Sequence, residues 1–118
     1  MSNYYLKAIL LDNCSYSIAA NNLIKNHNIP SKITNINTNE KEKFVTEQID
    51  TFPQIYLKKY NSKENLLLGG YDDLNYFIST FKSQKISDEN INDFNKKYKW
   101  SKKATLRLIQ LINTNQMN

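Results

Sequence analysis

The single cysteine of the chain, Cys14, is the residue whose type and position best suit chemistry. It follows a short apolar run, Leu6 to Leu11, and precedes a segment with helical spacing that begins near Ser15. A cysteine at the start of a helix lies near free backbone N–H groups and the positive end of the helix dipole, which stabilise the reactive thiolate. The position therefore predicts a nucleophilic thiol. The alternative is a small buried hydrophobic residue, which is a common use of a lone cysteine.

Two later segments carry turn residues that suit a binding site. Thr51-Phe52-Pro53 precedes the β-rich run Gln54 to Leu57, and the apolar run Leu66 to Leu68 ends in Gly69-Gly70 followed by Tyr71-Asp72-Asp73. Glycine allows a tight turn with positive φ, and acidic residues favour the first turn of a helix. The sequence therefore predicts a strand that opens on a proline and a strand-to-helix turn with an acidic start.

The three segments, in this order and spacing, resemble glutaredoxins over about residues 5–82. The turn Cys14-Ser15-Tyr16-Ser17 is similar to the CSYS turn of some monothiol glutaredoxins. The resemblance implies an α/β, thioredoxin-like fold with a mixed four-stranded sheet flanked by helices. The spacing of the apolar residues independently predicts a parallel strand-helix-strand unit joined to an antiparallel hairpin, and hence a mixed sheet.

The resemblance implies that Cys14 attacks a glutathione mixed disulfide and that a second glutathione then releases the enzyme. Ser15 and Tyr16 complete the active-site turn. Ser17 stands where many relatives have a second cysteine, and its hydroxyl cannot resolve a disulfide, which excludes a dithiol mechanism in this turn. Two roles remain for Ser17: a hydrogen bond to the Cys14 thiolate that lowers its pKa, or simple capping of the helix.

The glutathione-binding residues that the resemblance implies are Phe52, Pro53, Gly70, Tyr71 and Asp72. Pro53 matches a proline that is cis in this superfamily, and the backbone of Phe52 then pairs with glutathione as an added strand. The helix that opens at Tyr71 and Asp72 offers N–H groups to the γ-glutamyl carboxylate, and the Asp72 carboxylate takes the ammonium group. Helix capping is the alternative role for the acidic pair.

Glutaredoxins usually have a lysine three residues before the cysteine, where this chain has Leu11. This departure leaves two alternatives to a thiol–disulfide oxidoreductase. One is a binding module that keeps the fold and docks a partner through Pro53 and the C-terminal helices. The other is a [2Fe-2S] carrier that uses Cys14 and glutathione, although the bulky Tyr16 crowds the space for a cluster. Glutathione is expected as co-substrate, and no resident metal site is expected.

Spacing of apolar and turn residues predicts the remaining elements. Asn39 and Glu42 have the spacing of a capping box for a short helix that carries Phe44, Val45 and Ile49. The other expected elements are strands at Tyr4–Leu11, Ser31–Asn37, Gln54–Lys58 and Leu66–Leu68, and helices over Ser15–His27 and from Asp72 onward.

Residues 85–118 are expected to form a helical extension packed on a glutaredoxin-like domain of residues 1–84. Ser87 and Ser101 are predicted to cap two helices, with Trp100 as an anchor at their junction. The basic and aromatic residues at 96–103 also have a composition that can serve nucleic acid. Intramolecular packing of the two helices is the interpretation we prefer, so nucleic acid is not expected as a partner.

The composition fits an intracellular thiol protein. The chain has 118 residues, a hydrophobic content of 40% and a net charge of +5, and its apolar runs are too short for a membrane span. One cysteine excludes an intramolecular disulfide, and the N-terminus shows no secretory pattern. We therefore expect a cytoplasmic protein in a reducing compartment, monomeric or weakly dimeric, with glutathione and glutathionylated proteins as its partners.

Overall fold

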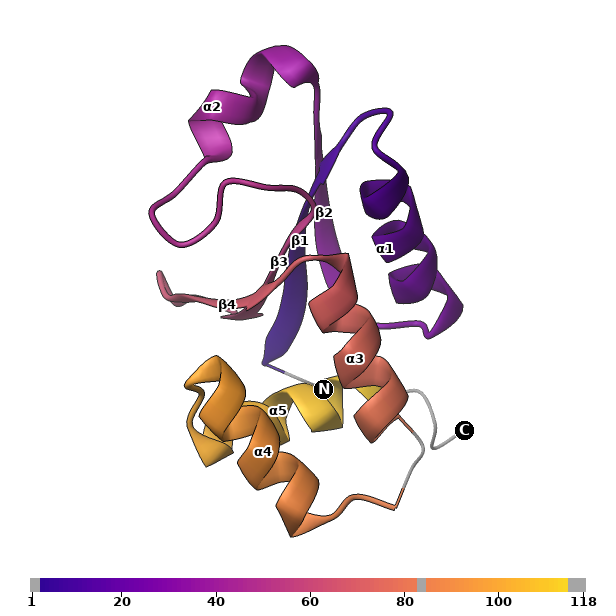
Figure 1. Ribbon diagram of the computed structural model, residues 1–118, viewed down its shortest axis with the longest axis vertical. Helices are drawn as coiled ribbons and strands as arrows, with labels where there is room; N and C mark the ends of the chain where they lie inside the picture. Colours follow the sequence, from indigo (N-terminus) through magenta and orange to yellow (C-terminus); the bar gives the residue numbers. More distant parts are fainter. Residues whose placement is uncertain (1–2, 83–84, 115–118) are drawn as a thin grey trace.

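A four-stranded mixed sheet organises the computed structural model, which describes residues 3–82 and 85–114 (Figure 1). The strand order is β2-β1-β3-β4. The strands β1 (Tyr4–Leu11) and β2 (Ser31–Ile36) are parallel, whereas β3 (Gln54–Lys59) is antiparallel to β1 and to β4 (Asn65–Gly69). The mixed sheet and the four strands predicted from the sequence are confirmed.

Helices lie on both sides of the sheet. The helices α1 (Ser15–Asn26) and α3 (Tyr71–Phe81) cover one face, and the short α2 (Lys41–Phe44) lies on the other side after a 3-10 turn at Thr38–Glu40. The buried residues of α3 recur at helical spacing, so one stripe of this helix faces the sheet. This arrangement leaves the turn between β1 and α1 at one end of the sheet.

The two faces of β1 contribute to different apolar clusters. Leu6, Ala8 and Leu10 pack in the larger cluster, which also includes buried residues of α1 and α3. Ile9, between them in sequence, packs against Tyr56 of β3 in a smaller cluster on the opposite face. Successive side chains of a strand point to opposite faces, so a largely apolar strand of this kind must be covered on both sides.

The start of the short helical segment differs from the sequence-based prediction. The expected capping box at Asn39 and Glu42 is wrong by two residues, because Asn37 and Glu40 have the same spacing and lie directly after β2. The backbone N–H of Asn37 donates to Oε1 of Glu40 at 3.0 Å. Val45 lies beyond the end of α2 and is exposed, so it does not contribute the apolar face that we expected.

Two further helices, α4 (Asp88–Tyr98) and α5 (Lys102–Ile112), pack at the other end of the sheet (Figure 1). The two predicted caps are confirmed. Ser87 Oγ accepts a hydrogen bond from the backbone N–H of Asn90 in α4 at 3.0 Å. Ser101 Oγ accepts one from the backbone N–H of Ala104 in α5 at 3.1 Å. Each cap satisfies a backbone donor that the helix itself leaves unpaired.

Aromatic side chains join α4 and α5 to the main core. Phe94 is fully buried, with ring centroids 4.9 Å from Phe77 and 5.3 Å from Trp100. Trp100 is 6% exposed, and its Nε1 donates to the backbone oxygen of Leu67 at 3.1 Å on the edge strand β4. Because Trp100 is buried, its ring is not available for stacking on nucleic-acid bases.

None of the helices in the described part of the chain combines the length and the apolar character that a membrane span requires.

Candidate active site

Cys14 is the N-cap residue of α1, with an extended backbone and a partly exposed side chain. The chain reaches it from β1 through a tight turn in which Asn13 has a φ of 60°. The thiol Sγ lies 4.0 Å from the backbone oxygen of Phe52, which belongs to the segment before β3. The thiol therefore lies between the first turn of α1 and the Phe52-Pro53 loop.

Ser17, in the first turn of α1, is only 2% exposed. Its Oγ accepts a hydrogen bond from the backbone N–H of Leu11 at 3.0 Å, which ties the end of β1 to the start of α1. A hydroxyl that accepts one hydrogen bond still has its own hydrogen to donate. Ser17 can thus hold the turn in place and also donate to the Cys14 thiolate.

The surroundings of Cys14 lower the pKa of its thiol. Partial burial raises the pKa, but the backbone N–H and hydroxyl of Ser17, the backbone N–H of Tyr16 and the positive charge of Lys41 together lower it by more. Hydrogen bonds and positive charge favour the thiolate over the neutral thiol. The net effect is a pKa below the ordinary value of a cysteine, and hence a larger thiolate fraction at neutral pH.

Lys41 is the site residue that sequence reasoning missed. It is the first residue of α2 and lies close enough to Cys14 for its charge to lower the thiol pKa. Leu11 stands three residues before Cys14, and no sequence pattern around Lys41 predicted that it lies near the thiol. The proximity of α2 to the β1–α1 turn depends on how distant segments pack in the fold. The spacing of residues within one segment cannot predict it.

The Phe52–Pro53 peptide bond is cis, and Pro53 is buried beside the turn between β4 and α3. A Cβ atom added to Gly70 would lie 3.5 Å from the backbone oxygen of Pro53. Gly69 has a φ of 136°, and a Cβ atom there would overlap the side chain of Asp73. The Gly-Gly turn therefore fits closely against both the proline loop and the start of α3.

The two acidic residues at the start of α3 have different surroundings. Asp73 Oδ2 accepts from the backbone N–H of Gly70 at 2.8 Å, and Asp73 Oδ1 accepts from the hydroxyl of Tyr98 at 2.7 Å. Burial, then the hydrogen bond and charge of Asp73, raise the pKa of Tyr98. Asp73 is thus a structural cap that also contacts α4, whereas the side chain of Asp72 is exposed to solvent.

Aromatic side chains from two of the turns meet near the thiol. The rings of Tyr16 and Tyr71 are tilted, with centroids 6.2 Å apart, and Tyr16 is 60% exposed. Ser15 is also exposed. The structure thus places the Cys14 turn, the Phe52-Pro53 loop and the Gly70-Tyr71-Asp72 turn together.

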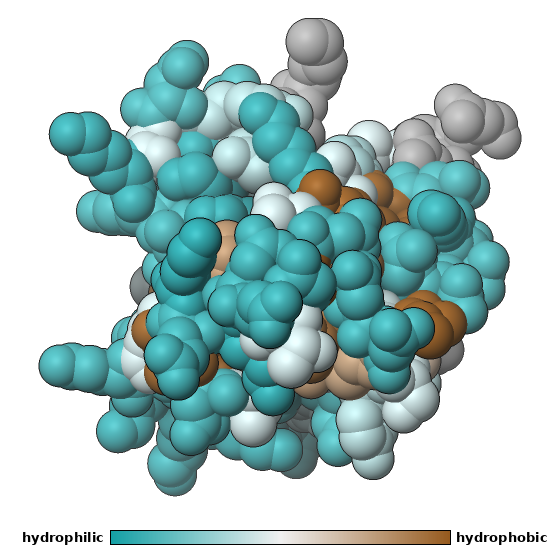
Figure 2. All heavy atoms as spheres, turned by 90° about the horizontal axis from the view of Figure 1, so that it is seen from above, coloured by the Kyte–Doolittle hydropathy of each residue, from teal (hydrophilic) through white to brown (hydrophobic). Residues whose placement is uncertain are grey.

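Figure 2 shows the end of the molecule that includes α2 and the β1–α1 turn. Its surface is mostly polar, with small separate apolar patches. In residues 3–82 and 85–114, no group of three or more His, Cys, Asp or Glu side chains is placed to hold a metal ion. The groups that the structure gathers at this site are the Cys14 thiol and the backbone groups around it.

Comparison with known proteins identifies the fold. Glutaredoxin 1 from Francisella tularensis, solved in complex with cacodylate, superposes with a TM-score of 0.54 and 21% sequence identity. The match covers 69% of this chain and 99% of that chain. Together with the strand order, this likeness shows that the protein has the thioredoxin-like fold of glutaredoxins. No protein-family model matches the chain, and no curated protein sequence matches it.

Proposed function

We propose that this protein is a monothiol, glutathione-dependent thiol–disulfide oxidoreductase with Cys14 as its nucleophile. The observation that carries the proposal is the position of Cys14 at the start of α1, where its pKa is lowered and its Sγ lies against the Phe52 carbonyl. The glutaredoxin-like fold supports it. The substrates are glutathionylated proteins, and the compartment is the reducing cytoplasm.

The reaction runs in two thiol–disulfide exchanges. In the first, the Cys14 thiolate attacks the glutathione sulfur of a protein–glutathione disulfide. A Cys14–glutathione disulfide forms, and the protein thiolate leaves and takes a proton from solvent. In the second, the thiolate of free glutathione attacks the glutathione sulfur on Cys14, which releases glutathione disulfide and regenerates the Cys14 thiolate. Ser17 stays chemically unchanged throughout and stabilises the thiolate by hydrogen bonding.

Glutathione binds along the Phe52-Pro53 loop and the start of α3. The backbone of Phe52 pairs with the cysteinyl part of glutathione, as an added strand would. The backbone N–H groups at Tyr71 and Asp72 bind the γ-glutamyl carboxylate, because the Gly70 N–H already donates to Asp73, and the exposed Asp72 side chain binds the ammonium group. Lys41 replaces the missing lysine and attracts the glycyl carboxylate, because it is the cation whose charge acts on Cys14.

The proposal is tested by turnover of a small glutathione mixed disulfide with glutathione as the reductant. We expect ping-pong kinetics for the wild type and no turnover for Cys14→Ser, since Cys14 is the only cysteine. Ser79→Ala, an exposed change on α3, is the control and should keep full activity. Absence of turnover in the folded wild type would contradict the proposal.

One observation favours a different function. Leu11 stands where relatives have a glutathione-binding lysine, which suits a non-redox binding module with the same fold. The two functions differ in their response to Asp72→Ala. In an oxidoreductase, this change raises KM for glutathione substrates and leaves the pKa of Cys14 unchanged. A binding module has no turnover of these substrates, so the change has no kinetic effect. A brown protein after anaerobic purification would instead support a [2Fe-2S] carrier.

A further inference from the structure

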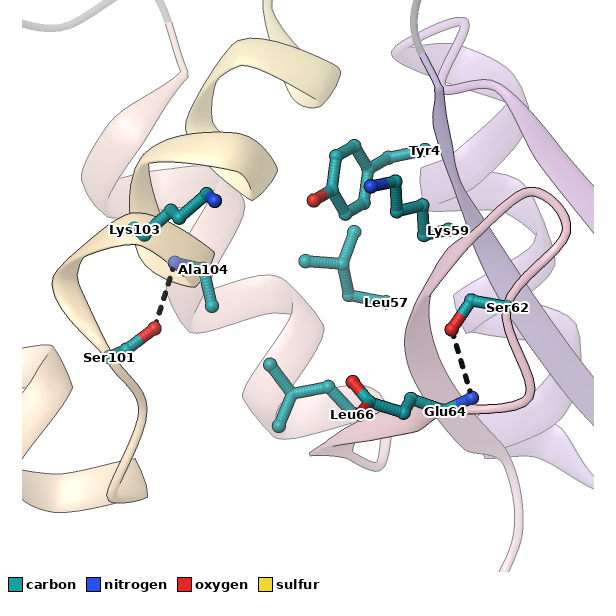
Figure 3. Close-up of a pocket in the computed structure, with 9 residues that line it drawn as sticks. All are labelled: Tyr4, Leu57, Lys59, Ser62, Glu64, Leu66, Ser101, Lys103 and Ala104. Carbon is teal, nitrogen blue, oxygen red and sulfur yellow. Dashed lines mark hydrogen bonds between the residues drawn. The ribbon is translucent and has the colours of Figure 1, made fainter.

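A pocket lies far from Cys14, at the opposite end of the sheet. It has a volume of about 240 Å³ and lies between the β3–β4 hairpin and α5 (Figure 3). Tyr4, the first residue of β1, lines it, whereas Cys14 follows the last residue of β1. This pocket is therefore separate from the thiol site and has no role in the reaction proposed above.

Part of the pocket lining is apolar, and the Glu64 carboxylate lies beside Leu66 at its edge (Figure 3). Leu57 of β3 is buried beneath it, and Leu66 of β4 and Ala104 of α5 are partly exposed toward it. The ring of Tyr4 forms the remaining apolar side. An apolar floor of this kind suits a flat ring or a short hydrocarbon group, because such a group loses contact with water when it binds there.

Cations surround this apolar floor. Lys59 of β3 and Lys103 of α5 direct their ammonium groups toward Tyr4 from opposite sides (Figure 3). Both lysines are exposed, and neither forms an ion pair within residues 3–82 and 85–114. The guanidinium group of Arg107 lies 5.8 Å from the centroid of the Tyr4 ring. Glu64 is the one carboxylate among the lining residues, so positive charge prevails.

Hydroxyl groups add uncharged donors on both sides. Ser62 Oγ accepts from the backbone N–H of Glu64 at 3.1 Å, and Ser101 Oγ accepts from the backbone N–H of Ala104 at 3.1 Å. Each hydroxyl therefore still has its own hydrogen to donate to a ligand. The first turn of α5 contains no acidic residue, so no carboxylate there offsets the positive charge. Ammonium and hydroxyl donors line this pocket, and the guanidinium group of Arg107 lines a neighbouring depression; such donors match the acceptor oxygens of a phosphate group.

The pocket adjoins a second depression of about 370 Å³, which shares Tyr4, Lys59 and Lys103 and adds Arg107. The cations thus form the boundary between two compartments. A pocket of about 240 Å³ is small for a complete ligand, since such sites typically measure roughly 300–1,000 Å³. It is suited to one ring system, with charged groups held at the boundary.

We propose that this pocket binds a nucleoside monophosphate or diphosphate. The base lies on the floor formed by Leu57, Leu66 and Ala104, and the phosphate oxygens bind Lys59, Lys103 and Arg107. A sugar phosphate would leave the apolar floor in contact with water, and a long acyl chain would exceed the pocket. The ligand is therefore a compact anion with a flat ring.

The test is a titration of the full chain, labelled with ¹⁵N, with ADP, AMP, adenosine and inorganic phosphate, followed by NMR. We expect ADP or AMP to shift the amide signals of Leu57, Leu66 and Ala104 and to bind more tightly than adenosine or phosphate. The double variant Lys59→Gln/Lys103→Gln should weaken binding by about tenfold or more, because each lysine supplies a charge-assisted contact. Lys25→Gln/Lys96→Gln, with the same net charge and exposed sites elsewhere, should bind like the wild type.

A second variant tests the floor without changing charge. Ala104→Leu fills the pocket and should weaken nucleotide binding while leaving the response to inorganic phosphate unchanged. Three results would overturn the proposal. The first is that millimolar ADP shifts none of these amide signals. The second is that both double lysine variants weaken ADP binding equally, and the third is that inorganic phosphate binds as tightly as ADP. Shifts of the same amides by a single-stranded oligonucleotide far below the ADP concentration would identify a nucleic-acid surface instead.

Discussion

The two ends of the sheet differ in how deeply their large apolar side chains are buried. At the Cys14 end, Tyr16 and Ile18 are 60% and 57% exposed, and the four-residue helix α2 lies above the sheet. At the opposite end, Phe94 and Leu108 are fully buried, and two complete helices pack on the main core. Buried aromatic area is a major source of stability, whereas a reactive thiol must remain accessible. The contrast indicates that stability and reactivity are concentrated at different ends.

Hydrogen bonds at Asp73 connect the two ends. Tyr98 at the end of α4 donates to Asp73, and Asp73 in turn holds the backbone N–H of Gly70. Gly70 lies against Pro53, and the neighbouring Phe52 oxygen faces Cys14. The helical extension therefore contacts the start of α3, where glutathione is proposed to bind, through the Asp73 carboxylate. Changes on either side of this carboxylate can show how independent the two ends are.

Phe94→Ala should have the largest effect on stability. The change removes a fully buried ring that contacts several other aromatic rings, so we expect a loss of about 3–5 kcal/mol in the free energy of unfolding. Tyr16→Ala is the matched change at the exposed end and should cost less than about 0.5 kcal/mol. Denaturant unfolding measures both. Equal costs would contradict the contrast between the two ends.

Ser17→Ala should affect stability and reactivity together. It leaves the partly buried backbone N–H of Leu11 without its partner, which costs about 1–3 kcal/mol. It also removes a hydroxyl that stabilises the thiolate, so the pKa of Cys14 should rise. Urea unfolding and the pH dependence of alkylation report the two effects. Ser15→Ala, an exposed neighbour, should change neither, and a similar response of both variants would argue against the role of Ser17.

Tyr98→Phe tests the connection between the ends and should cost about 1–2 kcal/mol, since it removes a hydrogen bond to a carboxylate. The pKa of Tyr98 is raised in the folded protein. Its contribution is therefore fully present below the unfolded value of about 10 and is lost as the pH rises above it. The wild type should lose stability above about pH 10 more steeply than Tyr98→Phe. Parallel pH profiles would show that the hydrogen bond contributes nothing.

Lys41→Gln should have the smallest effect. It removes one partly exposed charge, so the pKa of Cys14 should rise by less than in Ser17→Ala. KM for glutathione substrates should also rise. Lys43→Gln on the same short helix is the control, because Lys43 is exposed and is not among the charges that act on Cys14. Equal effects of the two changes would mean that only the net charge of α2 matters.

Much of the fold could be predicted from the sequence because its signals are local. The apolar run at Tyr4–Leu11 and the caps at Ser87 and Ser101 depend on neighbouring residues, and the structure has them where they were predicted. Two other interactions join segments that lie far apart in the chain. They are the effect of the Lys41 charge on the pKa of Cys14 and the hydrogen bond from Tyr98 to Asp73. Periodicity and capping patterns contain no information on such pairs, so these contacts had to come from the structure.

The most direct test of an activated Cys14 is the rate of its alkylation as a function of pH in the wild-type protein. The reagent reacts with the thiolate, and the only cysteine in the chain gives the signal. We predict a midpoint below the ordinary cysteine value of about 8.5, because the N–H groups of α1, the hydroxyl of Ser17 and the charge of Lys41 outweigh the effect of burial. A midpoint at or above that value would contradict it.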